Sequence, residues 1–384
     1  MSLTPLWITG WECGLATPVV LGTGLADTIA GTVSIQATTK RTGGYALRCT
    51  STGSSSYLQK TLASSDYHVG SVYIYFKDAL PNADNIIIRG VNADGDMAIY
   101  YESSDSKLYA GKVGVGLCAT GYTVTYNTWY RIDYRFYAAA TTHTADWQVN
   151  GVAQESYSVG SRSSNQMTAI RLGNSGVTAD TYFDDLALCS ASGDYPVGAH
   201  GVSGLRPNAD GTHNNAANVM ESADGTDIDA SGNPAYQFMD DNPWTSTHTE
   251  FVKQSTIGAE NYAEVQFEDT LFSTILGVQA VVGHHSSGTA ANDAETRIRD
   301  SDSQETVIFN GDVSETTLLY KTGVVSTPSG GWTQAHVNAL RARIGYSGDV
   351  TDVPYWDYLL LEVARSGSES FDTVLQITGE PKIG

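Results

Sequence analysis

One phrase occurs twice in this chain, about 170 residues apart. The first copy is RLGNSG at residues 171–176 with DTYFDDL at 180–186, and the second is RIGYSG at 343–348 with DVPYWDYL at 352–359. The copies align position by position, apart from the extra residue Pro354 in the second. A repeat of this length is too long for one unit of a solenoid. The pattern therefore predicts two copies of one domain type, each closed by a matching final strand.

Length and residue usage favour β-rich domains. A chain of 384 residues exceeds what one hydrophobic core usually serves, and its many Gly and Tyr residues are typical of short strands joined by tight turns. Residues 129–137 alternate: apolar side chains from Tyr130 to Phe136 lie on one face, with Arg131 and Asp133 on the other. This period is typical of a strand with one solvent-facing side. We predict an all-β chain of two tandem antiparallel β-sandwiches.

The repeat also predicts the domain boundaries. We expect a first sandwich over residues 1–192, a Gly- and Ser-rich linker over 193–204 and a second sandwich over 205–384. The polar stretch 206–235 is expected to form an extended arm that contacts a neighbouring molecule. A short helix is expected at 333–340, immediately before the second copy of the phrase.

Charge and apolar patterning exclude several classes of partner. A net charge of -21 repels phosphate backbones, so we expect no nucleic-acid binding. No apolar stretch is long enough to span a membrane, and the N-terminus lacks the pattern of a signal peptide, so we expect no membrane insertion and no export signal. Four widely spaced cysteines form no CxxC pair, and buried free thiols are expected. A disulfide stays open if the protein acts outside a cell.

Three segments resemble the concanavalin A-like jelly roll of laminin-G type: NTWYRI at 127–132, WQVNG at 147–151 and YFDDL at 182–186. In that family a strand of the first kind precedes a hairpin of the second kind, and an aromatic-Asp-Asp strand closes the sandwich. GWECG at 10–14 resembles the start of such domains in structural proteins of tailed bacteriophages, and the second half resembles a domain often appended there. The resemblance implies a virion component on a head, neck or tail, which in some cases touches glycans.

No catalytic set can be assembled from the sequence. Some concanavalin A-like relatives are glucanases with alternating Glu, Asp and Glu on one strand face, and the nearest match is EVQFE at 264–268. Its central residue is Gln266, so the Asp that would tune the nucleophile is missing. His284 and His285 are adjacent, would point in opposite directions on a strand, and are expected to have a loop role. We predict that the protein is not an enzyme.

Several acidic loops are candidates for calcium binding, because Ca²⁺ prefers hard oxygen ligands. The candidates are residues 94–96, 224–229 and 240–241, but none has EF-hand spacing and Asp-Gly is ordinary turn chemistry. We therefore predict no cofactor and no metal. The acidic residues that recur in the repeat, Asp184-Asp185 and Asp357, are expected to make hydrogen bonds that position the aromatic residues beside them.

The predicted ligand-binding residues are Trp129, Arg131 and Asp133. They share the polar face of their strand, and an exposed tryptophan ring there offers a surface on which a sugar can stack.

The function expected from these observations is a non-enzymatic structural protein of a phage virion. It would be a capsid decoration, spike or fibre component that is made in the host cytoplasm and carried in the virion. The alternative is a tail appendage that binds a carbohydrate or a host receptor. Expected partners are other virion proteins of capsid or tail, further copies of the chain in a homo-oligomer, and a host-surface glycan.

Overall fold

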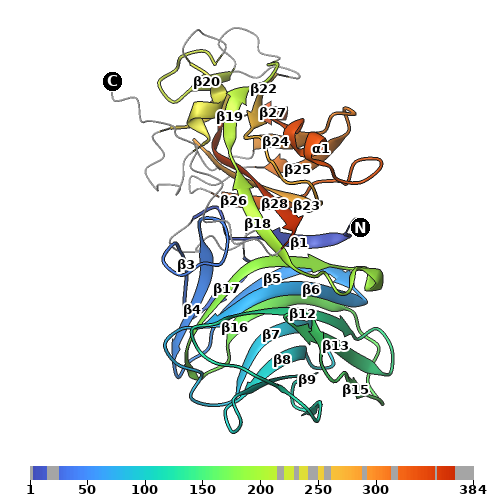
Figure 1. Cartoon of the computed structure of the whole chain (residues 1–384). Coiled ribbons are helices and arrows are strands. Elements are labelled where there is room, and N and C mark those ends of the chain that lie inside the picture. The colour runs from blue at the N-terminus through green and yellow to red at the C-terminus, as the bar shows by residue number, and fades with distance from the viewer. Residues whose placement is uncertain are drawn as a thin grey trace.

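Nearly all described residues of the computed structural model belong to β-strands or the turns between them (Figure 1). The structure describes residues 3–14, 26–213, 220–228, 233–240, 250–254, 261–287, 292–312, 319–350 and 353–367. The strands form four sheets, A to D, and every strand pair among these residues is antiparallel. The predicted all-β fold of antiparallel β-sandwiches is confirmed. Within the same residues, no helix is long and apolar enough to cross a membrane.

Residues 5–189 build sheets A and B. Sheet A has the strand order β14 (Val152–Ala153), β13 (His143–Val149), β12 (Trp129–Tyr137), β6 (Tyr67–Phe76), β17 (Thr178–Cys189), β4 (Ala46–Thr52) and β3 (Thr32–Gln36), with β1 (Pro5–Thr9) beside β17 and β15 (Tyr157–Val159) beside β13. Sheet B has the order β10 (Gly116–Leu117), β9 (Lys107–Lys112), β8 (Met97–Glu102), β7 (Asn85–Asn92), β16 (Met167–Asn174), β5 (Ser56–Ser65) and β2 (Thr28–Ala30), with β11 (Tyr122–Thr123) beside β9.

Residues 200–366 build sheets C and D. Sheet C has the order β20 (Met220–Ser222), β21 (Val252–Gln254), β28 (Pro354–Ser366), β23 (Ile275–Ser286) and β26 (Leu319–Val324), with β18 (His200–Leu205) beside β28. Sheet D has the order β19 (Pro207–Asp210), β22 (Tyr262–Phe267), β27 (Arg341–Val350), β24 (Asn292–Arg299) and β25 (Glu305–Asp312). Three short helical segments complete the described structure: η1 (Ser192–Asp194), η2 (Ala235–Phe238) and α1 (Gln334–Asn338).

The repeated phrase supplies the last two strands of each half. The first of the two lies in sheet B or D (β16, β27), and the second lies in sheet A or C (β17, β28). The first strand of each half, β1 or β18, pairs with that final strand. The predicted helix is also confirmed, because α1 begins after Thr333, whose hydroxyl accepts a hydrogen bond from the backbone N–H of His336 and so caps the helix.

The recurring acidic residues lie at β-bulges in these final strands. The register of β17 against β6 shifts between Asp184 and Ala187, and the register of β28 against β23 skips Asp357. Asp184 accepts a hydrogen bond from the backbone N–H of Arg41 (2.7 Å), and Asp357 Oδ2 lies 2.6 Å from His285 Nδ1. The expected hydrogen bonds are therefore present, but they lie at bulges within the strands rather than at a turn or a strand end.

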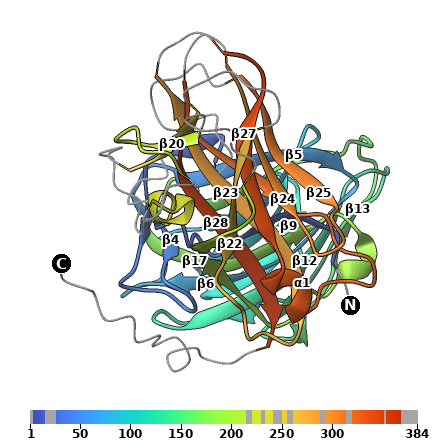
Figure 2. The ribbon, with the colours of Figure 1, turned by 90° about the horizontal axis from the view of Figure 1, so that it is seen from above.

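The two halves meet along sheet C, with β1 and β18 at the boundary (Figures 1 and 2). All twelve residues of β23 are buried. Val278 and Val282 belong to the core shared with sheet D, whereas Val281 packs into the core of the first half. In a strand that is buried on both faces, the sequence is a nearly continuous run of apolar residues and does not alternate between apolar and polar ones. The two halves are therefore packed against each other along β23.

A buried carboxylate lies in this interface. Glu362 Oε1 accepts hydrogen bonds from the Thr9 hydroxyl (2.9 Å) and from the backbone N–H groups of Gly10 and Glu12 (3.1 Å each). Glu362 Oε2 accepts one from Gln279 (3.3 Å). Burial raises the pKa of Glu362 to about 7, although these hydrogen bonds favour the charged form.

Three expectations about the second half need correction. The last part of the expected linker, residues 200–204, belongs to strand β18. The described parts of the expected arm fold back on their own half: β19 pairs with β22, and Met220 and Ile228 are buried in the second core. His284 and His285 lie in β23, not in a loop. His284 stacks on Phe309 with ring centroids 4.3 Å apart, and burial lowers its pKa to about 3.

Candidate functional site

The three site residues predicted from the sequence differ in how exposed they are in the structure. All three lie on β12, and Trp129 is half-buried with its ring 5.1 Å from that of Tyr75. Asp133 is fully buried: it accepts from Arg131 Nε at 2.7 Å and from the backbone N–H of Gly198 at 2.8 Å. The expectation that Asp133 faces solvent is wrong, because the segment after β17 covers this face. Arg131 keeps only a partly exposed side chain.

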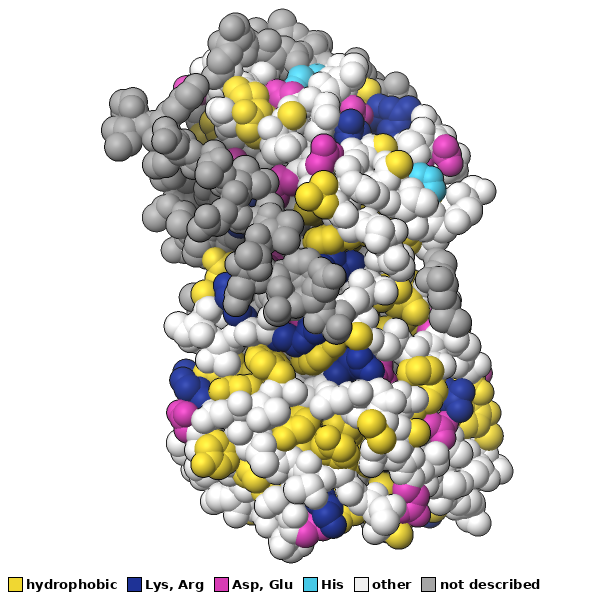
Figure 3. Space-filling view, in the orientation of Figure 1, with side chains coloured by type: hydrophobic (Ala, Val, Ile, Leu, Met, Phe, Trp, Pro, Cys, Tyr) yellow, Lys and Arg dark blue, Asp and Glu magenta, His cyan; other side chains and the backbone are white. Residues whose placement is uncertain are grey.

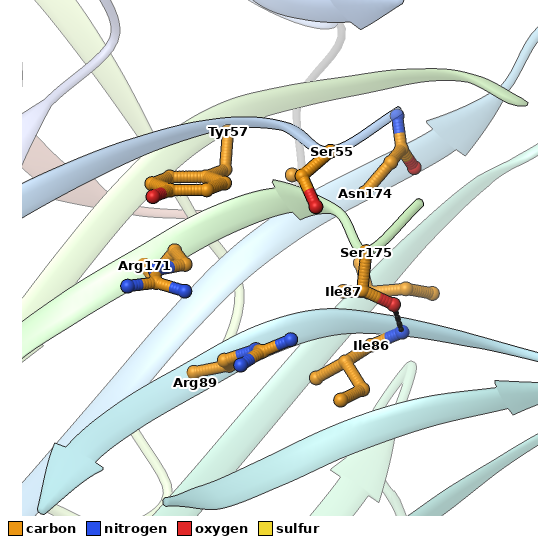
Figure 4. A pocket seen from close by; sticks show the side chains of 9 residues that line it. Ser55, Tyr57, Ile86, Ile87, Arg89, Arg171, Asn174 and Ser175 are labelled. Atoms are coloured by element: carbon orange, nitrogen blue, oxygen red, sulfur yellow. Dashed lines mark hydrogen bonds between the residues drawn. The ribbon is translucent and has the colours of Figure 1, made fainter. Parts of the chain in front are cut away.

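A different set of side chains comes together on the outer face of sheet B (Figure 4). Tyr57 on β5, Arg171 on β16 and Arg89 on β7 come from three adjacent strands. In the register of the sheet, Arg171 lies directly opposite Arg89, and Tyr57 lies opposite Gly173. All three residues are partly buried. We call Tyr57, Arg171 and Arg89 the arginine row of the first half.

Arg171 is held in a defined position. Its guanidinium carbon lies 4.0 Å from the centroid of the Tyr57 ring, and Nε and Nη2 donate to Gln59 Oε1 at 3.1 and 2.7 Å. Gly173 makes this stack sterically feasible, because a Cβ at that position would lie 2.5 Å from Tyr57 Cα. The Arg-x-Gly spacing of the repeated phrase thus has a physical reason: the glycine lets the neighbouring strand bring its tyrosine beneath the arginine.

A small hollow lies beside the arginine row, with a cavity volume of about 20 Å³. Besides the row, its lining includes Ser55, which is exposed, and Ser175, whose hydroxyl accepts a hydrogen bond from the Ile86 N–H at 2.9 Å. Arg89 borders the hollow, and its one ion-pair partner among the described residues is Asp96 at 3.5 Å. Burial, followed by the charge of Arg171, lowers the pKa of Arg89.

The second half carries an equivalent row on the outer face of sheet D. Arg343 takes the place of Arg171 in the repeated phrase, and its guanidinium lies 4.2 Å from the ring centroid of Tyr262. Tyr262 lies opposite Gly345, and Arg343 lies opposite Arg297. The same spatial pattern therefore occurs twice, in both outer sheets.

The carboxylates considered as catalytic residues are engaged elsewhere. Glu264 Oε2 lies 2.7 Å from Arg343 Nε and its Oε1 accepts from Thr212 N–H at 3.0 Å. Glu268 accepts from the backbone N–H of Arg206 at 3.1 Å. Glu264 is buried, so the expectation of a solvated strand face is wrong for this residue, because Arg343 and the loop at 211–212 cover it.

The candidate calcium loops have ordinary turn contacts. Asp94 lies 3.5 Å from Lys112, and Asp224 accepts from the Ser222 hydroxyl at 2.6 Å. Hydrogen bonding, first of all from Ser222, lowers the pKa of Asp224. Asp229 and Asp241 lie outside the described residues. Within the described ranges, no group of three or more His, Cys, Asp and Glu side chains is arranged to hold a metal ion. All four cysteines are buried free thiols, as expected.

Sequence reasoning missed the arginine row although the signal was present. Arg171 and Arg343 open the two copies of the phrase, and the glycine two residues later recurs with them. The tyrosine and glutamine that complete the first-half arrangement lie about 110 residues away, on β5. Only the register of β5 against β16 brings them together.

No protein-family model and no curated protein sequence matches the chain. Among solved structures, it is similar to a cellulose-induced protein with 14% identity and a TM-score of 0.39, covering 48% of this chain and 97% of that chain. It is similar to carbohydrate-binding module CBM66 from Bacillus subtilis with 14% identity and a TM-score of 0.30, covering 45% and 100%. It is also similar to a tandem CBM22 domain from Paenibacillus barcinonensis Xyn10C with 12% identity and a TM-score of 0.27, covering 94% and 98%. Likeness at these levels assigns neither a family nor a function.

Proposed function

We propose that the chain is a non-enzymatic glycan-binding protein whose ligand lies on the outer face of sheet B. The observation that carries this proposal is the half-exposed stack of Arg171 on Tyr57 beside a hollow. Sugars present C–H surfaces that pack on aromatic rings and hydroxyl groups that accept from fixed N–H donors. A guanidinium already held by Gln59 and Tyr57 loses little side-chain entropy when a ligand binds.

The contacts of two glutamates in the second half favour a binding role for the protein over a catalytic one. The two carboxylates nearest to a glucanase pattern, Glu264 and Glu268, are bound by Arg343 and by backbone N–H groups. A general acid needs a proton and a nucleophile needs an accessible oxygen. Neither role fits carboxylates with these contacts.

The test is a glycan array followed by calorimetric titration of the oligosaccharide that binds best. Tyr57→Ala is expected to abolish binding, because it removes the ring that supports Arg171. Tyr262→Ala removes the equivalent ring under Arg343 in the second half and is the matched control, with binding retained. A silent array, or equal binding by both variants, would refute the proposal.

The residues predicted from the sequence enter the same test as a separate arm. Trp129 is half-exposed and available for stacking, whereas Asp133 is closed off by Arg131 and Gly198. Loss of binding in Trp129→Ala, with Tyr57→Ala unaffected, would move the ligand to the outer face of sheet A. In that case the proposed location is wrong and the glycan-binding function stands.

We also propose, on the sequence resemblance alone, that the protein is a component of a tailed-phage particle. In this proposal it is a capsid decoration, spike or fibre, with other virion proteins and further copies of itself as partners. Purified particles should contain the chain when analysed by mass spectrometry, and the free protein should be an oligomer by mass photometry. A stable monomer that does not bind to particles lacking it argues against this role.

A further inference from the structure

The two arginine rows have the same geometry but different charge. In the second half, Arg343 is neutralised by Glu264 at 2.7 Å and by Glu305 at 3.1 Å. Its neighbour Arg297 is neutralised by Glu295 and Glu305, each at 2.7 Å. These carboxylates compensate both guanidinium groups, so the second-half row is a closed ion-pair network. In Figure 3, acidic and basic side chains occur on the face in view in both the upper and the lower part of the molecule.

The first-half row lacks this compensation. The position opposite Arg171 is Gln59, where the second half has Glu264 opposite Arg343. The contacts of Arg171 in the described structure are the neutral side chains of Gln59 and Tyr57. Arg89 adds a second positive charge with one carboxylate, Asp96, at 3.5 Å. Two guanidinium groups therefore share one negative charge, in a chain whose net charge is -21.

Placing two like charges on adjacent strands costs free energy unless an opposite charge compensates them. The side chain of Arg89 is only 18% exposed, so water screens this repulsion poorly. The second half compensates with its own glutamates. In the first half, Arg89, Arg171 and Ser55 line the same hollow (Figure 4).

We propose that Arg89 and Arg171 bind an anionic group of the glycan, either the carboxylate of an acidic sugar or a sulfate ester. This inference rests on the proposed function and specifies its ligand. The planar guanidinium fork matches the geometry of both groups, and its charge-assisted hydrogen bonds are stronger than neutral ones. The exposed hydroxyl of Ser55 lies at the same hollow and supplies a further donor.

The sharpest test is a substitution that gives the arginine row of the first half the ion pairing found in the second half. Gln59→Glu has nearly the same shape as the parent and places a carboxylate where Arg171 Nε and Nη2 now donate. The introduced charge should hold Arg171 and exclude the anion. The mirror variant Glu264→Gln alters the second-half row and is the control. Arg89→Gln is the second test variant, since it removes one charge without touching Gln59.

The probes are an oligogalacturonate, its methyl ester, a sulfated galactan oligosaccharide and its desulfated form. We expect the parent and Glu264→Gln to bind at least one anionic probe, and Gln59→Glu and Arg89→Gln to bind it about tenfold to a hundredfold more weakly, as for loss of hydrogen bonds to a charged group. Added salt should weaken binding by the parent. Thermal melting of each variant shows that the fold is retained.

The outcomes separate the inference from the proposed function. Binding of the carboxylate probe alone, the sulfate probe alone or both supports the inference and identifies the group. Equal binding of charged and neutral forms, unchanged in Gln59→Glu and Arg89→Gln, overturns the inference but leaves glycan binding in place. No binding of any glycan overturns both.

Discussion

Replacement of Glu362 by glutamine is expected to change how the stability of this protein depends on pH, because it removes one buried titratable group. The Glu362 carboxyl is buried in the interface between the halves, and burial raises its pKa from the usual 4.5 to about 7. In the unfolded chain the carboxyl returns to its ordinary value. Between these two pH values the folded chain therefore binds more protons than the unfolded chain, and the free energy of unfolding falls as pH rises.

The size of the effect follows from the difference between the two pKa values. Each pKa unit corresponds to about 1.4 kcal/mol, so the shift of Glu362 corresponds to about 3 kcal/mol. This contribution is fully present below about pH 4.5 and is lost as pH rises through about 7. Burial also raises the pKa of Glu12 and of Asp184, and these two groups act in the same direction as Glu362. Burial lowers the pKa of His68 and of His284 to about 3, and these two groups act in the opposite direction. The parent and the variant share all four groups, so the comparison between the two chains isolates Glu362.

The assay is urea unfolding of the parent and of Glu362→Gln at several pH values from about 5 to about 8, because the midpoint and slope together give the free energy. From the acidic to the basic end of this range, the free energy of unfolding of the parent should fall relative to that of the variant. Glu264→Gln is the control, since Glu264 is ion-paired with Arg343 on the outer face of sheet D, and its profile should follow that of the parent. A difference between the parent and Glu362→Gln that stays constant over this range contradicts the reasoning.

Three further predictions concern packing and reactivity. Gly173→Ala should lower the free energy of unfolding by about 1–3 kcal/mol, because its Cβ would lie 2.5 Å from Tyr57 Cα, and an unchanged urea midpoint would show that β5 and β16 are not so close. Trp356→Ala should cost about 3–5 kcal/mol, because the side chain is fully buried and its indole N–H donates to Thr296 at 3.2 Å; a loss below about 1 kcal/mol in the same measurement would contradict its place in the core. The Cys49 thiol, whose pKa is raised by burial, should not react with a thiol reagent in the folded chain but should react in urea, and fast labelling of the native protein would disprove its burial.

Part of the candidate site was within reach of sequence reasoning. Arg171 and Gly173 recur as Arg343 and Gly345, and this recurrence alone marks the pair as a structural unit. The sequence could not predict that the pair supports a stack of Arg171 on a tyrosine ring, because that tyrosine, Tyr57, lies on another strand. The prediction for Asp133 failed for a related reason: alternation within β12 places it on the outer face correctly but does not show that Gly198 covers it.

The amino-acid sequence by itself determined the β-fold, the short helix within 333–340 and the buried thiols, and its internal repeat determined the matching final strands of the two halves. Each depends on side-chain period, turn residues or a capping side chain, which act over a few residues. The tertiary structure alone decided which faces are covered and which charges meet. Strand β23 is buried on both faces because the first half packs on it, and Arg171 has no carboxylate partner among the described residues because the register of β5 places Gln59 opposite it. Such contacts join segments about 100 residues or more apart, and no local period encodes them.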